Sequence, residues 1–160
     1  MPTETYTLST PLPPGILPSR AVSLLHDASN LINLSPYVIS SRKIITSDSY
    51  TPKSNDPKVQ LWKVTDKVSI LPFGLWDSSV EVPLEFVNKG DGVEVSKFPP
   101  LMGLVIRERW AVDEKEVRLD VALEGGKVVL MGVGKMMRGN HEGYVRGFGG
   151  LMESAQGKPR

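Results

Sequence analysis

The sequence predicts an α+β fold in which a curved antiparallel sheet wraps around a long C-terminal helix and encloses a cavity. Two observations support this prediction. Between residues 80 and 123 apolar residues alternate with a period of two, which is typical of strands that bury one face. After Gly125-Gly126 the period becomes about three and a half, which is typical of an amphipathic helix. A single sheet must cover its apolar face, and only this helix is long enough to do so.

The first part of the chain is predicted to hold a strand and a pair of helices. Residues 4–8 are Thr-rich and alternate weakly, which favours a strand that ends at the prolines from Pro11 onward. Ser19 is a favourable N-cap, and apolar residues at helical spacing follow it. Ser29-Asn30 can divide this region into two short helices, and Pro36 ends it.

Six further strands and one helix are predicted after this region. β-Branched residues, alternation and turn-forming stretches between the runs support the strand assignments. The strands are expected over residues 38–46, 59–64, 80–86, 93–98, 104–112 and 117–123. The last four runs form an antiparallel meander. The helix is expected over residues 128–154, with one apolar face.

The composition predicts one domain, residues 1–155, followed by a flexible tail, 156–160. The chain has 160 residues, of which 40% are hydrophobic, with no cysteine and two histidines. This excludes disulfides, thiolate nucleophiles and Cys-ligated metals, and we expect neither a metal nor a cofactor.

A net charge of +1 without a basic stripe argues against nucleic-acid binding. No apolar stretch approaches the roughly 20 residues of a membrane span, and residues 1–12 lack the pattern of a secretory signal. We therefore expect a cytoplasmic protein.

Scattered segments carry a resemblance to a known family. They are residues 23–39 (SLLHDASNLINLSPYVI), 62–66 (WKVTD), 100–104 (PLMGL) and 109–112 (RWAV), together with Leu130-Met131 and His141. In these segments the chain resembles a fungal START-like family, long catalogued as a domain of unknown function, with the helix-grip fold of Bet v 1-like proteins. It is similar to the small enzymes of aurovertin- and citreoviridin-type pathways, which close a linear polyketide into an α-pyrone. The resemblance implies a hydrophobic cavity between sheet and helix, and a lactonizing activity that needs no cofactor.

His141 and residues 107–109 are the candidate catalytic residues. His141 lies on the apolar face of the C-terminal helix, where a buried imidazole is either a neutral general base or a hydrogen-bonded core residue. Glu108 occupies an inward strand position that should be apolar. It is therefore paired with a cation, protonated, or displaced by a bulge that turns Arg107 or Arg109 inward. An edge-strand bulge with all three charges in water is the competing interpretation.

Aromatic and apolar residues could line a channel for a flat conjugated chain. The candidates are Trp62, Trp76, Trp110, Met137, Tyr144 and Phe148. For each of them, ordinary core packing is the competing interpretation. His26-Asp27 could form an acid–base pair. In a continuous helix His26 faces solvent, so this role is favoured only if Asp27 ends the first helix.

Three functions remain open. The first is cyclisation of a linear polyketide acid or thioester to an α-pyrone, in which His141 takes the enol proton and Arg107, Arg109 or protonated Glu108 stabilises charge on the carbonyl oxygen. The second is a carrier that binds a hydrophobic metabolite or lipid without changing it. The third is a homodimer contact through small residues on the helix face opposite His141. These are Gly132, Gly139, Gly143 and Gly150, with Gly147 beside them.

Overall fold

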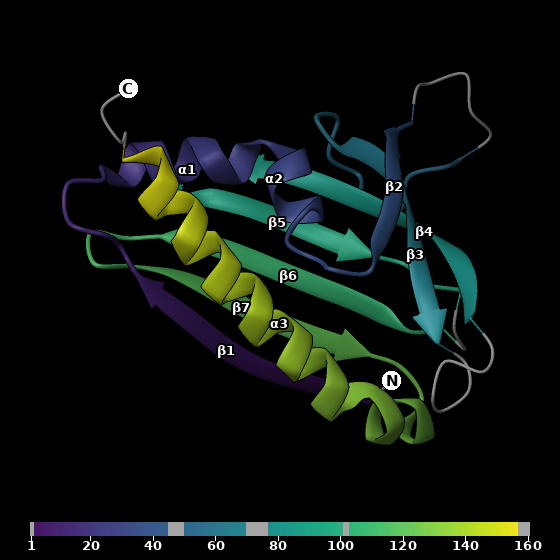
Figure 1. Cartoon of the computed structure of the whole chain (residues 1–160). Coiled ribbons are helices and arrows are strands. Elements are labelled where there is room, and N and C mark those ends of the chain that lie inside the picture. The colour runs from purple at the N-terminus through teal and green to yellow at the C-terminus, as the bar shows by residue number, and fades with distance from the viewer. Residues whose placement is uncertain (1, 45–49, 70–76, 101–102, 157–160) are drawn as a thin grey trace.

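The structure, a computed structural model, describes residues 2–44, 50–69, 77–100 and 103–156. In these residues a seven-stranded antiparallel sheet has the strand order β1-β7-β6-β5-β4-β3-β2. The sheet is twisted, and all three helices lie on the same face of it (Figure 1). The predicted α+β class, with a curved antiparallel sheet and a long C-terminal helix, is confirmed.

The order of the elements is the predicted one. The strands are β1 (Thr3–Pro11), β2 (Val38–Lys43), β3 (Gln60–Ser69), β4 (Asp77–Lys89), β5 (Gly92–Lys97), β6 (Val105–Val112) and β7 (Glu116–Glu124). The helices are α1 (Pro18–His26), α2 (Ala28–Ile32) and α3 (Lys127–Ala155). Residues 157–160 of the predicted tail lie outside the described residues. No helix among the described residues combines the length and the apolar character needed to cross a bilayer.

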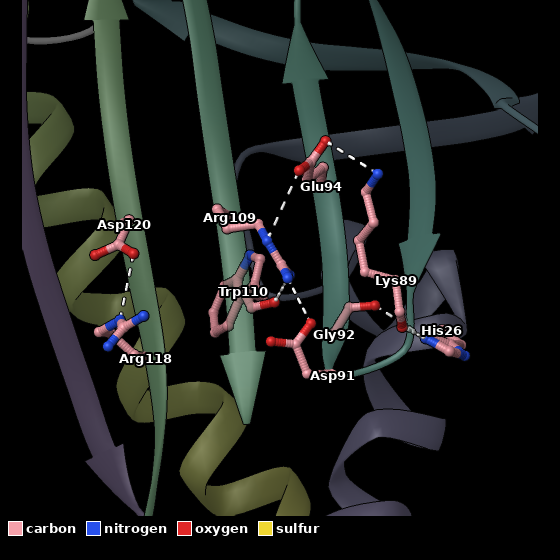
Figure 2. A network of polar contacts seen from close by, with 9 residues as sticks. All are labelled: His26, Lys89, Asp91, Gly92, Glu94, Arg109, Trp110, Arg118 and Asp120. Atoms are coloured by element: carbon pink, nitrogen blue, oxygen red, sulfur yellow. Dashed lines mark hydrogen bonds and ion pairs between the residues drawn. The ribbon is translucent and has the colours of Figure 1, made fainter. Parts of the chain in front are cut away.

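The break between α1 and α2 lies at Asp27, slightly before the predicted division. Asp27 has extended backbone angles, and its carboxylate accepts a hydrogen bond from the backbone N–H of Ser29, as an N-cap does. His26 does not contact this carboxylate. Its Nε2–H donates to the backbone carbonyls of Lys89 and Gly92, at 2.8 and 2.9 Å (Figure 2). His26 therefore holds the β4–β5 turn against α1, and the His26-Asp27 acid–base pair is not formed.

The hydrophobic core lies between the sheet and the three helices. Alternate residues of the central strands point into it, as the period of two predicts. The ring centroids of Trp110 on β6 and Phe148 on α3 lie 5.5 Å apart, which is a favourable distance for two aromatic rings. α3 runs along β1 and β7 and covers this end of the sheet, while α1 packs on β5 and β6 (Figure 1).

The glycines of α3 fall into two main groups. Gly147 belongs to neither, because a Cβ there would lie 3.2 Å from Cδ2 of Leu34. A Cβ on Gly134 would lie 2.5 Å from Oε2 of Glu4, and one on Gly149 would lie 2.9 Å from Oγ1 of Thr10. Both glycines let the helix approach β1 closely. In contrast, a Cβ would meet no atom within 4 Å at the predicted outer-face glycines Gly132, Gly139, Gly143 and Gly150. The homodimer contact through this face stays a prediction.

We expect Gly139→Ala to raise the free energy of unfolding by about 0.5–1 kcal/mol, because Ala is the better helix former and its methyl group meets no neighbour. Urea denaturation measures the change. Gly149→Ala is the matched control, since its methyl group must displace Thr10 and the gain should shrink or reverse. Equal stabilisation by both variants would contradict this explanation of the two groups.

Candidate functional site

Four polar side chains from four elements form a continuous chain of contacts on the inner face of the sheet. Oη of Tyr6 on β1 lies 2.6 Å from Nδ1 of His141 on α3. Nε2 of His141 lies 2.7 Å from Oε1 of Glu108 on β6. The same carboxylate oxygen lies 2.7 Å from Nζ of Lys97 on β5. We call Tyr6, His141, Glu108 and Lys97 the buried polar chain, since Glu108 is 4% exposed and His141 is 1% exposed.

Strand register explains why Glu108 points inward. It lies opposite Val95 on β5 and Val121 on β7, in ladders without a register shift. Directly opposed residues share one face of a sheet, and both valines are buried in the core. The predicted bulge is therefore wrong. Of the alternatives for Glu108, pairing with a cation is confirmed, and the cation is Lys97.

Glu108 and Lys97 are an ion pair. Burial by itself would raise the pKa of Glu108, but the charge of Lys97 and the hydrogen bond from His141 outweigh it and lower the pKa to about 2. Burial would lower the pKa of Lys97, but the charge of Glu108 outweighs burial and raises it. Glu108 is thus an acceptor with two donors, and Nε2 of His141 carries a hydrogen.

Nδ1 of His141 has two polar neighbours. It lies 2.6 Å from the Tyr6 hydroxyl and 2.8 Å from the backbone carbonyl oxygen of Met137. The Tyr6 hydroxyl donates to Nδ1 where Nδ1 carries no hydrogen, and an Nδ1–H donates to the Met137 carbonyl where it carries one. Burial and the charge of Glu108 raise the pKa of Tyr6, so its hydroxyl keeps its proton. Nδ1 therefore has a partner in either role.

A small cavity lies between the sheet and the helices, with a volume of about 50 Å³. That volume holds a few water molecules, and a small-molecule site is usually about 300–1,000 Å³. Most of the lining is apolar and comes from α2, the segment after it, and strands β2 to β6. Polar side chains at the cavity are Ser35, Asp66, Lys97, Glu108 and Tyr144.

His141 is not one of the lining residues of this cavity. It lies behind Glu108, with Nδ1 directed to Tyr6 and the Met137 carbonyl on the β1 side. His141 thus contacts the 107–109 segment through Glu108. However, the groups of the buried polar chain that reach the cavity are Glu108 and Lys97.

Asp66 is a second acid at the cavity. It lies opposite Val80 on β4, on the inner face, and its Oδ1 is buried without a hydrogen-bond partner among the described residues. Burial raises the pKa of Asp66, and the positive charge of Lys97 opposes this only in part. A carboxylate with a raised pKa and an oxygen without a partner among the described residues is suited to accept a proton. No group of three or more His or acidic side chains in the described part of the chain is placed to bind a metal.

Arg107 and Arg109 point away from the cavity, so the expectation that they border it is wrong. They flank Glu108, and successive side chains of a strand point to opposite faces. On the outer face Nε of Arg107 lies 3.1 Å from Oε1 of Glu124. Arg109 contacts Asp91 and Glu94, as Figure 2 shows.

The predicted binding residues separate into lining and core residues. Trp110 and Tyr144 line the cavity. Phe148 is buried against Trp110, and Trp62 and Met137 pack against the edge of the core, so these three do not reach the cavity. Trp76 lies outside the described residues.

Sequence reasoning missed Tyr6, Asp66 and Lys97. The sequence pattern could have identified Lys97 and Asp66. Lys97 lies two residues after the buried Val95, and Asp66 lies two residues after the buried Val64, so each polar residue occupies an inward position of its strand. This is the signal that identified Glu108. For Tyr6 no signal was available, since a tyrosine in a strand is usually a core residue.

Acid should destabilise the protein through Glu108. A carboxyl whose pKa is lowered by folding contributes stability that is complete above its ordinary pKa and is lost as the pH falls through the folded value. The fall from 4.5 to about 2 corresponds to about 3 kcal/mol, lost between about pH 5 and 2. Urea denaturation over this range measures it.

Glu108→Gln should remove most of this pH dependence. Glu81→Gln is the matched control. Glu81 forms an exposed ion pair with Lys63, so its substitution should leave the dependence of stability on acid pH unchanged. An acid profile that is the same in the Glu108→Gln variant and the unmodified protein would contradict the assignment.

Several solved structures share this fold. Ara h 8.0201 is 14% identical over 96% of this chain and 99% of its own, with a TM-score of 0.57. The Zhui aromatase/cyclase from Streptomyces sp. R1128 is 8% identical over 98% and 99%, with a TM-score of 0.61. The di-domain ARO/CYC BexL from the BE-7585A biosynthetic pathway is 12% identical over 98% of this chain and 51% of its own, with a TM-score of 0.61. These likenesses establish the helix-grip fold of Bet v 1-like and START proteins.

The sequence comparisons define the family. No curated protein sequence matches the chain. Residues 1–141 match the family described as a domain of unknown function, DUF7053. This match includes β1, the whole sheet and His141, and thus all four residues of the buried polar chain. Because it spans most of the 160 residues, the chain belongs to the DUF7053 family.

Proposed function

We propose that the protein is a cyclase of linear polyketide acids or thioesters that needs no cofactor, and that its product is an α-pyrone. One observation carries this proposal: Asp66 and Lys97 face the same apolar cavity, one with a free buried carboxylate oxygen and the other with an ammonium group. An acceptor for a proton and a donor for a carbonyl oxygen are the two groups that ring closure requires.

In the proposed reaction Asp66 takes the proton of the enol hydroxyl at the δ-carbon of the substrate. The enol oxygen then forms a bond to C1, and the Lys97 ammonium stabilises the negative charge that develops on the C1 oxygen. The tetrahedral intermediate collapses with loss of the thiol or of water, and protonated Asp66 returns its proton to that leaving group. The bond lost is that between C1 and the leaving group, so the step consumes no oxidant or reductant.

Glu108, His141 and Tyr6 are positioning residues in this proposal. The 2.7 Å contact with Glu108 fixes the Lys97 ammonium at the cavity wall, and His141 holds the opposite side of that carboxylate. Tyr6 in turn holds His141. The proton transfer is thus assigned to Asp66, and His141 acts through Glu108.

One further observation concerns the class of reaction, and a second concerns how the substrate enters the cavity. The aromatase/cyclases among the structural neighbours have this fold, which supports ring closure as a reaction that the fold can carry out. The cavity volume of about 50 Å³ requires the short helix α2 and the sheet to move apart before a polyketide chain enters.

Incubation of the purified protein with a linear 3,5-dioxo polyene thioester tests the proposal. We expect pyrone to form faster than in buffer, as measured by chromatography and mass spectrometry. Arg107→Met is the matched control, since Arg107 lies on the outer face and its loss should leave the rate unchanged. A rate equal to that in buffer would exclude this activity.

A carrier of hydrophobic metabolites is the second candidate. The apolar lining favours it, because a chain without reactive groups would fit the same surface. Recovery of an intact bound compound after hours of incubation, with no conversion, would identify a carrier. Conversion of that compound would instead favour the cyclase.

A further inference from the structure

The N-terminal half of α3 carries an exposed apolar patch. Val128 is 82% exposed, Met131 is 79% exposed and Met136 is 55% exposed. They lie on the side of the helix turned away from the sheet, where Gly132 and Gly139 add no side chains. Figure 1 shows this end of α3 at the margin of the sheet, near the N-terminus of the chain. Large side chains with this exposure, gathered on one helix, mark an interaction surface.

The charge around this patch is positive. Lys127 and Lys135 are exposed, and among the described residues neither forms an ion pair. Arg138 follows one turn later and pairs with Glu142, the first acidic residue of α3. Two acidic residues of the packed strands lie near this part of α3. Glu4 of β1 approaches Gly134 on the sheet side of the helix, and Glu124 at the end of β7 is paired with Arg107.

The exposed apolar side chains and the positive charge together favour an anionic lipid surface over a second copy of the chain. A second copy docked through the same patch would bring the lysines of both copies together, and like charges repel. An anionic lipid surface instead attracts the lysines and admits the apolar side chains between the headgroups. We therefore propose that the face of α3 formed by Lys127, Val128, Met131, Lys135 and Met136 docks on anionic membrane surfaces. In this proposal α3 lies on the surface of the membrane.

Co-sedimentation with lipid vesicles tests this proposal without any substrate. We expect binding to phosphatidylcholine vesicles in which roughly a third of the lipid is phosphatidylserine, weak binding to phosphatidylcholine alone, and weaker binding as salt is added. Val128→Glu with Met131→Glu should abolish binding. Lys127→Gln with Lys135→Gln should weaken it by roughly 25-fold, at about fivefold per lysine.

Leu17→Glu is the matched control, because Leu17 is 68% exposed and directly precedes α1, which starts near the C-terminal end of α3 (Figure 1). It should bind vesicles as the unmodified protein does. Equal binding to both kinds of vesicle, or binding that survives Val128→Glu with Met131→Glu in a folded protein, would overturn the proposal. A dimer in light scattering that the same double variant abolishes would assign the patch to a second copy and would also overturn it.

Discussion

Replacing Lys97 with Met is expected to lower the free energy of unfolding by about 3–5 kcal/mol. The substitution keeps the length and the apolar stem of the side chain but removes the charge that lies 2.7 Å from Oε1 of Glu108. Glu108 is 4% exposed and cannot regain water, so its charge stays buried without its cation. Urea denaturation near neutral pH, with the unmodified protein beside it, measures this loss.

A double variant separates the charge from the packing. Lys97→Met combined with Glu108→Leu removes both charges, and most of the lost stability should return, because a buried ion pair replaced by apolar residues is often neutral or stabilising. The difference between the double variant and the sum of the single variants gives the coupling energy. A Lys97→Met variant that loses less than about 1 kcal/mol would place the pair in the class of exposed ion pairs and contradict its burial.

The fold was predictable because each strand or helix buries one face, so its apolar residues recur with the period of that element. The change of period after Gly125-Gly126 located α3, and the alternation from residue 80 onward located four strands. The site was predictable only where a polar residue broke such a pattern, as Glu108 does. Lys97 breaks its pattern in the same way, but its partner lies on a neighbouring strand, and strand register fixes that contact.

The errors at the site have a common physical cause. The inward position of Glu108 settles the direction of Arg107 and Arg109, because neighbours in a strand point to the opposite face. Only an assumed bulge could turn them inward, and the ladders on both sides of β6 contain none. His141 was placed on the correct helix face. Its position behind Glu108, away from the cavity, depends on how α3 lies over β1, and close approaches at single glycines set that geometry.

Replacing Asp66 with Asn is expected to lower the rate of pyrone formation by about 10²–10⁴-fold, the usual contribution of a positioned general base. Asn preserves the shape of the side chain but does not accept the enol proton. In the unmodified protein the rate should fall as the pH falls through the raised pKa of Asp66, since the carboxylate form is the active one. Initial rates across the pH range, with protein stability measured beside them, check both expectations.

Measurements of stability distinguish a catalytic role of Asp66 from a structural one. Because burial raises the pKa of Asp66, the folded state holds that proton more tightly than the unfolded state. The unmodified protein therefore loses stability as the pH rises from the ordinary pKa of Asp to the raised one, and Asp66→Asn lacks this loss. At neutral pH the variant should thus be at least as stable as the unmodified protein while being nearly inactive. Asp120→Asn is the matched control, since Asp120 lies on the outer face, where it pairs with Arg118 (Figure 2) and accepts a hydrogen bond from Thr7. Full activity in a stable Asp66→Asn variant would show that the proton goes to another group, and the cyclisation would then depend on the Lys97 ammonium and on positioning alone.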